Sequence, residues 1–166
     1  MENDLLARVY RQYSREIRLY LYVLSKNETL AEDLTQETFL KALLSLPAEH
    51  PNVRAWLYTV ARNLYYDSRK KDRRIVNDEI SDREDDVHPG PEDTILASER
   101  DRALMRAVTE LEERKREIVQ LHYFSGVPLK DAAALTGLTP ENARVLLFRA
   151  KKELRIKMEA LGYDIP

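Results

Sequence analysis

Charged and apolar side chains alternate along residues 139–152 in a spacing that suits contact with DNA. Arginine donates paired hydrogen bonds to guanine, and apolar groups contact the methyl group of thymine. A helix that enters the major groove contacts bases from its N-terminal part. The candidates for base contact are therefore Glu141, Arg144, Val145 and Phe148. Thr139 and Asn142 accompany them, while Arg149 and Lys152 lie further along and are predicted to meet phosphate.

Two helices with a tight turn between them would position these side chains. Pro128 suits the first position of a short helix, and Gly137 suits the left-handed turn that ends it. Thr139 and Pro140 are typical of the cap and first position of a second helix. Its predicted inner stripe is Ala143, Leu146, Leu147, Ala150 and Leu154. The pattern indicates a helix-turn-helix, and the alternative is an ordinary helical hairpin with a solvated basic face.

A second basic stretch, residues 53–74, interleaves tyrosines with arginines and lysines. Its predicted inner stripe is Val53, Trp56, Leu57, Val60, Ala61 and Leu64. The positions predicted to lie mostly outside are Tyr58, Arg62, Asn63, Tyr65, Tyr66, Arg69, Lys70, Arg73 and Arg74. Bases stack on such rings, at about 1–3 kcal/mol each, while the cations neutralise phosphate. A nucleic-acid surface is predicted, and the alternative is a basic helix end that complements the helix dipole.

Acidic and amide side chains form a compact set on a helix predicted over about residues 30–46. Asp33, Gln36 and Glu37 are spaced i, i+3, i+4 and therefore share one face. Taken alone, such a face is usually solvated. No partner base or metal-ligand pattern accompanies these carboxylates, so an enzyme active site is not predicted.

Several other classes of chemistry are excluded by composition. The chain has no cysteine, and His50, His88 and His122 are too scattered to indicate a metal site, so no cofactor, metal or catalytic residue is predicted. No apolar run is long enough for a membrane span, and no signal peptide is evident. A cytoplasmic protein is therefore predicted. An all-α fold is predicted because glycine is scarce and alternating strand-like runs are absent.

Charge divides the 166 residues into three parts. Residues 1–75 carry 13 basic and 10 acidic residues, giving +3. Residues 76–95 carry one arginine and eight acids, giving −7, and residues 96–166 carry 13 basic and 11 acidic residues, giving +2. Two mildly basic modules are therefore predicted to flank an acidic linker, which suits a nucleic-acid-binding protein better than the net charge of −2.

These motifs together resemble a bacterial extracytoplasmic-function (ECF) sigma factor of the sigma-70 family. Residues 31–42, AEDLTQETFLKA, resemble the second conserved region of these proteins. Residues 53–63, VRAWLYTVARN, with Asp67, are similar to the region that melts the promoter and recognises the −10 element. Residues 111–121 with the helix-turn-helix resemble the region that recognises the −35 element. The resemblance extends from about Leu5 to Arg155.

The resemblance implies a role for each surface. Asp33, Gln36, Glu37 and Leu40 match positions that dock on the polymerase β′ clamp. The loop 47–52, with His50 and Asn52, matches the segment that captures a flipped-out base of the −10 element. The implied −10 contacts on the following helix are Tyr58, Arg62, Asn63, Tyr66, Asp67, Arg69, Lys70 and Arg73. Trp56 is expected to pack in the core.

The sequence thus predicts two small helical domains, 1–75 and 96–166, joined by an acidic linker, 76–95. As a sigma factor the chain would direct RNA polymerase core to promoters, in a stress or envelope-signal response, without catalysing a reaction. Its implied partners are the core (β′ clamp and β), the −35 duplex, the −10 single strand and an anti-sigma factor that could hold it at the membrane. The linker's acids either mimic nucleic-acid phosphates in the polymerase or form only a solvated tether. The alternative function is a free-standing helix-turn-helix regulator.

Overall fold

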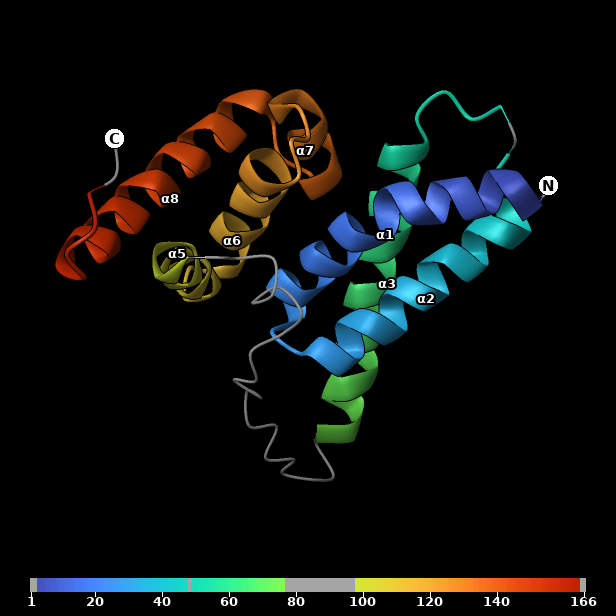
Figure 1. Cartoon of the computed structure of the whole chain (residues 1–166), viewed down its shortest axis with the longest axis horizontal. Helices are drawn as coiled ribbons and strands as arrows, with labels where there is room; N and C mark the ends of the chain where they lie inside the picture. The colour runs from blue at the N-terminus through green and yellow to red at the C-terminus, as the bar shows by residue number, and fades with distance from the viewer. Residues whose placement is uncertain (1–2, 48, 77–97, 165–166) are drawn as a thin grey trace. The chain divides into compact units, whose positions relative to one another are not determined.

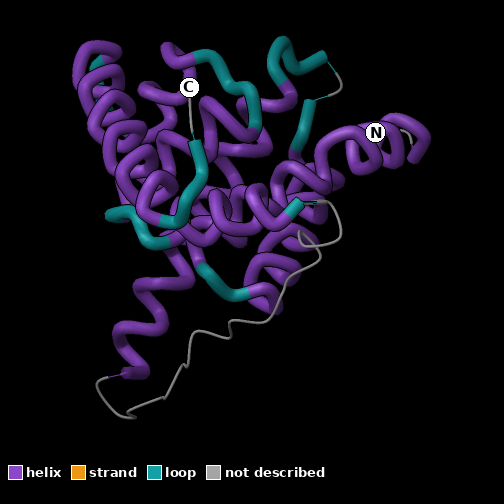
Figure 2. Tube along the Cα trace, turned by 60° about the vertical axis from the view of Figure 1, so that its left-hand side comes forward, coloured by secondary structure: helices purple, strands orange, loops and turns teal. Residues whose placement is uncertain are grey.

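The computed structural model describes residues 3–47, 49–76 and 98–164, with only the backbone for residue 3 and residues 72–76. These residues form helices, turns and loops, and no strand occurs among them (Figures 1 and 2). The prediction of an all-α protein is confirmed. The chain divides into two compact units, Met1–Val87 and His88–Pro166, and most of the predicted linker lies outside the described residues.

The N-terminal unit contains three helices, α1 (Asn3–Ser25), α2 (Glu28–Ser45) and α3 (Val53–Val76). α1 packs along α2, and α3 contacts both (Figure 1). Asn27 caps α2, because its side-chain oxygen accepts a hydrogen bond from the Leu30 N–H at 3.0 Å. Apolar side chains of the three helices form one core that includes Ile17, Leu21, Leu24, Ala31, Phe39, Ala42, Leu57 and Ala61.

One polar contact joins α1 to the first turns of α3. The Glu16 carboxylate accepts hydrogen bonds from Arg54 Nη2 at 2.7 Å and from the Tyr58 hydroxyl at 3.0 Å. Burial lowers the pKa of Arg54, but the hydrogen bond and charge of Glu16 outweigh burial, so this pKa lies above its ordinary value. The contact is partly exposed, with the two charged side chains 24% and 30% accessible, and it ties the start of α3 to the core.

We expect Glu16→Ala to lower the free energy of unfolding of the N-terminal unit by about 1–2 kcal/mol. The substitution removes the carboxylate to which the Tyr58 hydroxyl donates, together with a charge-assisted bond to Arg54. Urea unfolding followed by circular dichroism would measure the loss. Glu49→Ala, which removes an exposed carboxylate from the loop before α3, should change the unfolding free energy by less than about 0.5 kcal/mol. Equal effects of the two changes would contradict a stabilising role for Glu16.

The C-terminal unit consists of α5 (Glu99–Thr109), α6 (Glu113–Val119), the π-helical turn η1 (Gln120–Phe124), α7 (Leu129–Thr136) and α8 (Pro140–Ala160). α8 contacts α5, α6 and α7, and its buried side chains are Ala143, Leu147, Ala150, Leu154 and Met158. α6 runs directly into η1, where the Ser125 N–H donates to the Gln120 carbonyl at 2.9 Å. The sequence pattern did not indicate this change of helix type.

The predicted packing of α3 needs correction. On α3 the inner stripe includes Tyr58, which is fully buried, and Tyr65, which is nearly so, whereas Val53, Trp56 and Val60 are only half-buried. The stripe is rotated because both tyrosines bury their rings and bond their hydroxyls internally, Tyr65 to the Leu24 carbonyl at 3.0 Å. On α1, Tyr10 is half exposed and packs edge-on against Phe39.

Candidate nucleic-acid and partner interfaces

The turn between α7 and α8 has the geometry that the sequence predicts. Gly137 adopts a left-handed conformation with φ of 72°, and the Leu138 N–H donates to the Ala133 carbonyl at 2.9 Å, which closes the end of α7. Alanines 132, 133 and 143 are buried, so the two helices pack closely. Pro128 is the residue before α7 rather than its first residue. The helix-turn-helix arrangement is present.

The outer face of α8 presents every side chain that the sequence assigned to it. Phe148 is 69% accessible and Val145 is 49% accessible, and their spacing of three residues places the two apolar side chains beside each other on this face. All eight predicted −35 residues are exposed: Thr139, Glu141, Asn142, Arg144, Val145, Phe148, Arg149 and Lys152. The face combines donors, an acceptor and apolar groups, which is the chemistry required to distinguish bases in the major groove.

Thr139 fixes the first turn of this face. Its hydroxyl oxygen accepts a hydrogen bond from the Asn142 N–H at 3.1 Å, so it caps α8. We expect Thr139→Ala to lower the free energy of unfolding of the C-terminal unit by about 1 kcal/mol, because one N–H of the first turn loses its acceptor. Thr139→Ser keeps an acceptor and should retain most of the stability in a thermal or urea unfolding experiment. An equal loss in both variants would contradict the capping role.

The loop between α2 and α3 is ordered by two side chains that the sequence singled out. His50 Nδ1 accepts a hydrogen bond from the Asn52 N–H at 3.0 Å, and Asn52 Oδ1 accepts from the Ala55 N–H at 3.0 Å. Asn52 therefore caps α3 and is exposed. These two bonds do not use the amide nitrogen of Asn52 or Nε2 of His50. Residue 48 of this loop lies outside the described residues.

The outer face of α3 carries two rows of predicted −10 residues. Asn63, Asp67 and Lys70 are exposed, and Arg62, Tyr66 and Arg69 are half-buried. The Arg62 guanidinium lies 4.7 Å from the centre of the Tyr66 ring, and that of Arg69 lies 5.9 Å from it. Such cation–π contacts orient the arginines beside an aromatic ring, an arrangement that suits a single strand.

Of the remaining predicted −10 residues on α3, Tyr58 lies away from this surface, and the side chain of Arg73 is not described. The prediction that Tyr58 lies outside is wrong, because its ring is fully buried and its hydroxyl is bonded to Glu16. Tyr58 therefore has no ring face available for a base.

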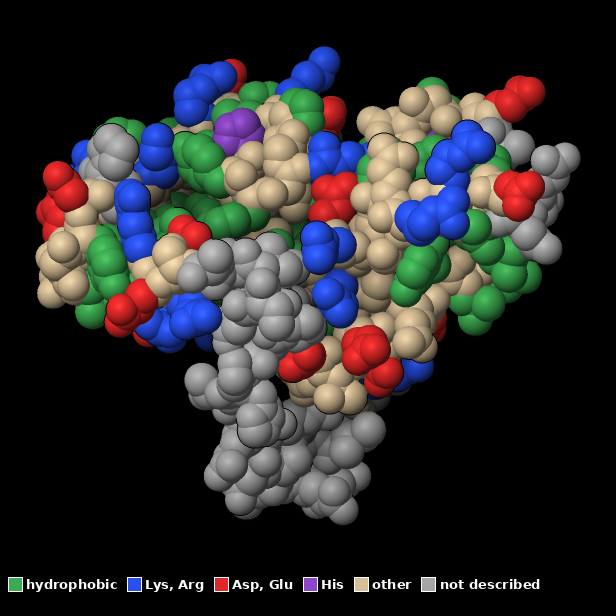
Figure 3. Space-filling view, viewed as in Figure 1, with side chains coloured by type: hydrophobic (Ala, Val, Ile, Leu, Met, Phe, Trp, Pro, Cys, Tyr) green, Lys and Arg blue, Asp and Glu red, His purple; other side chains and the backbone are tan. Residues whose placement is uncertain are grey.

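The polar row of α2 is continuous with an apolar one that the sequence-based prediction missed. Asp33, Gln36, Glu37 and Leu40 are all exposed. Leu43 and Leu44, which follow on the same helix, are 40% and 75% accessible. Apolar side chains gather over this end of α2 in Figure 3. The row of Asp33, Glu37, Leu40 and Leu44, with spacings of four, three and four, would have indicated it.

Neither a metal site nor a membrane span is found in the described part of the chain. No group of three or more His, Cys, Asp or Glu residues there could hold a metal ion. No helix there is long and apolar enough to cross a membrane.

The comparisons with known proteins assign both units to one family. Residues 9–75 match the model of sigma-70 region 2, and residues 101–154 match that of sigma-70 region 4. The chain belongs to the sigma-70 family. The sigma factor is 30% identical to the ECF RNA polymerase sigma factor SigM of Bacillus subtilis, over 89% of this chain and 91% of SigM. It is 34% identical to the ECF sigma factor BldN of Streptomyces coelicolor over 92% of its own length, but spans 60% of BldN. The relatives identify it as an ECF sigma factor.

A solved structure supports the same assignment. The sigma factor RpoE, in a co-crystal with the anti-sigma factor NepR from Bartonella quintana, superimposes with a TM-score of 0.77 at 26% identity, covering 92% of this chain and 96% of that one. CnrH, solved with the cytosolic domain of CnrY, has the same fold, with a TM-score of 0.67 at 20% identity. The predicted family and fold are confirmed.

Proposed function

We propose that this sigma factor binds bacterial RNA polymerase core through α2 and directs it to promoters through α3 and α8. The observation that carries the proposal is the presence of region 2 and region 4 in one chain, in that order. Each region also exposes most of the side chains that the function requires. The sigma factor itself catalyses no reaction, acts in the cytoplasm and responds to an envelope or other stress signal.

The row of Asp33, Gln36, Glu37 and Leu40 serves as the docking site for the core. Its two carboxylates and one amide offer acceptors to basic side chains of the β′ clamp, while Leu40, with Leu43 and Leu44, offers apolar area. A mixed surface of this kind is typical of specific interfaces, in which charge sets orientation and apolar burial adds affinity.

The −10 strand is held by the α2–α3 loop and the outer face of α3. His50 and Asn52 line the site of a flipped base, Asn63 and Asp67 contact neighbouring bases, and Lys70 meets the backbone. Extruding a base costs a few kcal/mol, which stacking beside Tyr66 and hydrogen bonds to the base edge offset. The −35 duplex receives α8 in its major groove.

A helix-turn-helix regulator and a sigma factor differ in what they bind without a partner. We expect the purified protein to co-elute with core polymerase in size-exclusion chromatography and to bind promoter duplex tightly only as the complex. Tight, sequence-specific binding of duplex by the isolated protein, without co-elution, would favour the regulator. In that case the exposed row Asp33, Gln36 and Glu37 would have no assigned role.

An anti-sigma factor is a second expected partner, because the relative RpoE crystallised in complex with one. Such a protein would cover the docking row or the DNA surfaces and could hold the sigma factor at the membrane until a signal releases it. The domain limits that go with this proposal are 1–75 and 96–166. The acidic linker, 76–95, would act either as a phosphate mimic in the polymerase or as a tether.

A further inference from the structure

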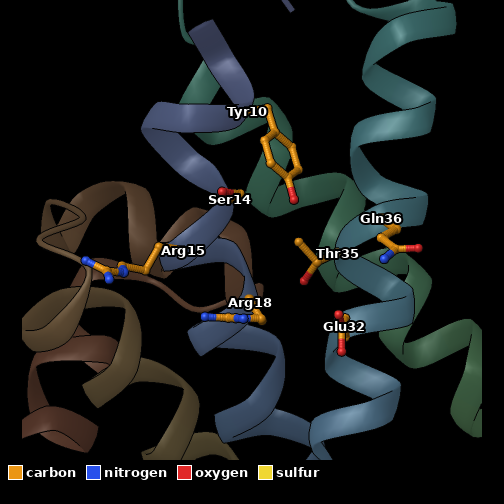
Figure 4. Close-up of a pocket in the computed structure, with 7 residues that line it drawn as sticks. All are labelled: Tyr10, Ser14, Arg15, Arg18, Glu32, Thr35 and Gln36. Atoms are coloured by element: carbon orange, nitrogen blue, oxygen red, sulfur yellow. The ribbon is translucent and has the colours of Figure 1, made fainter. Parts of the chain in front are cut away.

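A cleft of about 210 Å³ lies between α1 and α2 of the N-terminal unit (Figure 4). Its lining includes Tyr10, Ser14 and Arg18 from α1, and Glu32 and Gln36 from α2. Tyr10 and Ser14 lie on successive turns of α1, while Arg18 and Glu32 lie across from each other on the two walls (Figure 4). None of the roles assigned above uses this cleft as a whole.

The size and polarity of the cleft fit one inserted side chain. Pockets for small molecules measure roughly 300–1,000 Å³ and are mainly apolar. This cleft is smaller, and its lining residues are polar or charged apart from the Tyr10 ring. A side chain presented by a protein partner is therefore a better fit than a free ligand.

The charges in the cleft define the chemistry of that side chain. Arg18 and Glu32 have opposite charges, yet the described residues include no ion pair or hydrogen bond to either. Arg18 Nε is buried and has no hydrogen-bond partner among them. An unsatisfied buried donor on a charged group is costly, and a carboxylate is the acceptor that pairs best with a guanidinium.

Other donors surround the same position. The Tyr10 and Ser14 hydroxyls come from the wall that carries Arg18. The Thr35 hydroxyl hydrogen is not available to a ligand, because it is donated to the Ala31 carbonyl at 2.6 Å. Arg15 also lines the cleft, although its side chain extends away from α2 (Figure 4), and it adds a second positive charge on the α1 side. The α1 wall therefore favours an incoming carboxylate.

Gln36 connects the cleft to the docking row on α2, because it belongs to both. We propose that the cleft between α1 and α2 receives an acidic side chain from the polymerase core segment that docks on α2, with Arg18 as its counter-charge. The docking site then has two electrostatic halves, an acidic one on α2 and a basic one on α1. This inference rests on the proposed function, since it needs the core to dock on α2.

Charge reversal in the cleft tests the proposal. Core affinity of the full chain would be measured by competition against a fluorescent wild-type sigma factor at two salt concentrations. Arg18→Glu should raise the Kd about tenfold or more, and Arg18→Gln should raise it less, because it removes the charge without reversing it. Arg8→Glu makes the same charge change at an exposed site on α1 that does not line the cleft, and should alter the Kd by less than about twofold. Equal effects of Arg18→Glu and Arg8→Glu, or no effect of Arg18→Glu, would overturn the proposal.

A crosslinking experiment identifies the partner group directly. The natural chain has no cysteine, so Ser14→Cys would carry the only thiol and could be labelled with a photoreactive crosslinker. With core polymerase it should form an adduct to a peptide that contains Asp or Glu, and Gln12→Cys, on the opposite side of α1, should not. Equal adducts from both sites, or a Ser14 adduct to a peptide without an acid, would overturn the proposal.

The experiments distinguish failure of the cleft proposal from failure of the proposed function. If wild type binds core and Asp33→Ala weakens it while Arg18→Glu does not, only the cleft proposal fails. If wild type does not bind core at all, the proposed function fails with it. Thermal unfolding of Arg18→Glu and Arg18→Gln checks that each variant folds. If Arg18→Glu does not fold, the core affinity of Arg18→Gln alone decides the test.

Discussion

Replacing Arg144 with alanine is expected to relax the −35 sequence preference of the holoenzyme. Arg144 is exposed near the start of α8, in the position from which such a helix contacts base edges. A paired contact to one base contributes about 1–3 kcal/mol of discrimination, so the best −35 element should lose roughly tenfold to a hundredfold in affinity. Transcription from a library of −35 variants would reveal the change as a new tolerance at one base position.

Arg149→Ala should behave differently because Arg149 lies further along α8 and is assigned to phosphate. Its loss should weaken binding uniformly across sequences and reduce the slope of log K against log salt by about one. Arg155→Ala, an exposed change on a later turn of the same helix, is the control and should do neither. An equal loss on every sequence from both Arg144→Ala and Arg149→Ala would mean that neither side chain distinguishes bases.

The combined change of Asp33, Gln36 and Glu37 to alanine should weaken binding to core polymerase by a factor of about 100 or more. Truncating charged groups that become buried in an interface costs about 2–5 kcal/mol, because the partner charges are left unpaired. The three side chains are exposed on α2 and outside the core, so the fold should remain intact. Competition with labelled wild type measures the affinity, and circular dichroism verifies the fold.

Glu28→Ala is the matched control for this triple change. Glu28 lies in the first turn of α2, and its position in the helical repeat places it on another face from Asp33. Glu28→Ala should change the affinity for core polymerase by less than about twofold relative to wild type. If the triple variant bound core as tightly as wild type, the docking role of α2 would be contradicted, whatever the effect on DNA.

The surface of α8 was predictable because local signals agree there. Gly137, the Thr139 cap and the stripe of Ala143, Leu147, Ala150 and Leu154 all indicate the same turn and the same buried face. Exposure then follows by geometry for the remaining positions. Each of these signals lies within a few residues of the feature that it predicts.

The face of α3 was predicted less well, because tyrosine is amphipathic. A periodicity argument placed Tyr58 and Tyr65 outside, but each buries its ring and bonds its hydroxyl to a group more than 40 positions earlier. Pairings of this kind, like the placement of Arg18 and Glu32 on opposite walls of the α1–α2 cleft, depend on how the helices pack. A single sequence contains no local pattern that predicts such contacts between distant residues.

Transcription from a genomic fragment library by core polymerase plus this sigma factor tests the central claim most directly. The expected result is a small set of new start sites, absent with core alone, that share one −35 and one −10 element at constant spacing. Sites that depend on core but share no upstream element would contradict promoter recognition by α3 and α8. No new starts, together with tight duplex binding by the protein alone, would contradict the sigma-factor function itself.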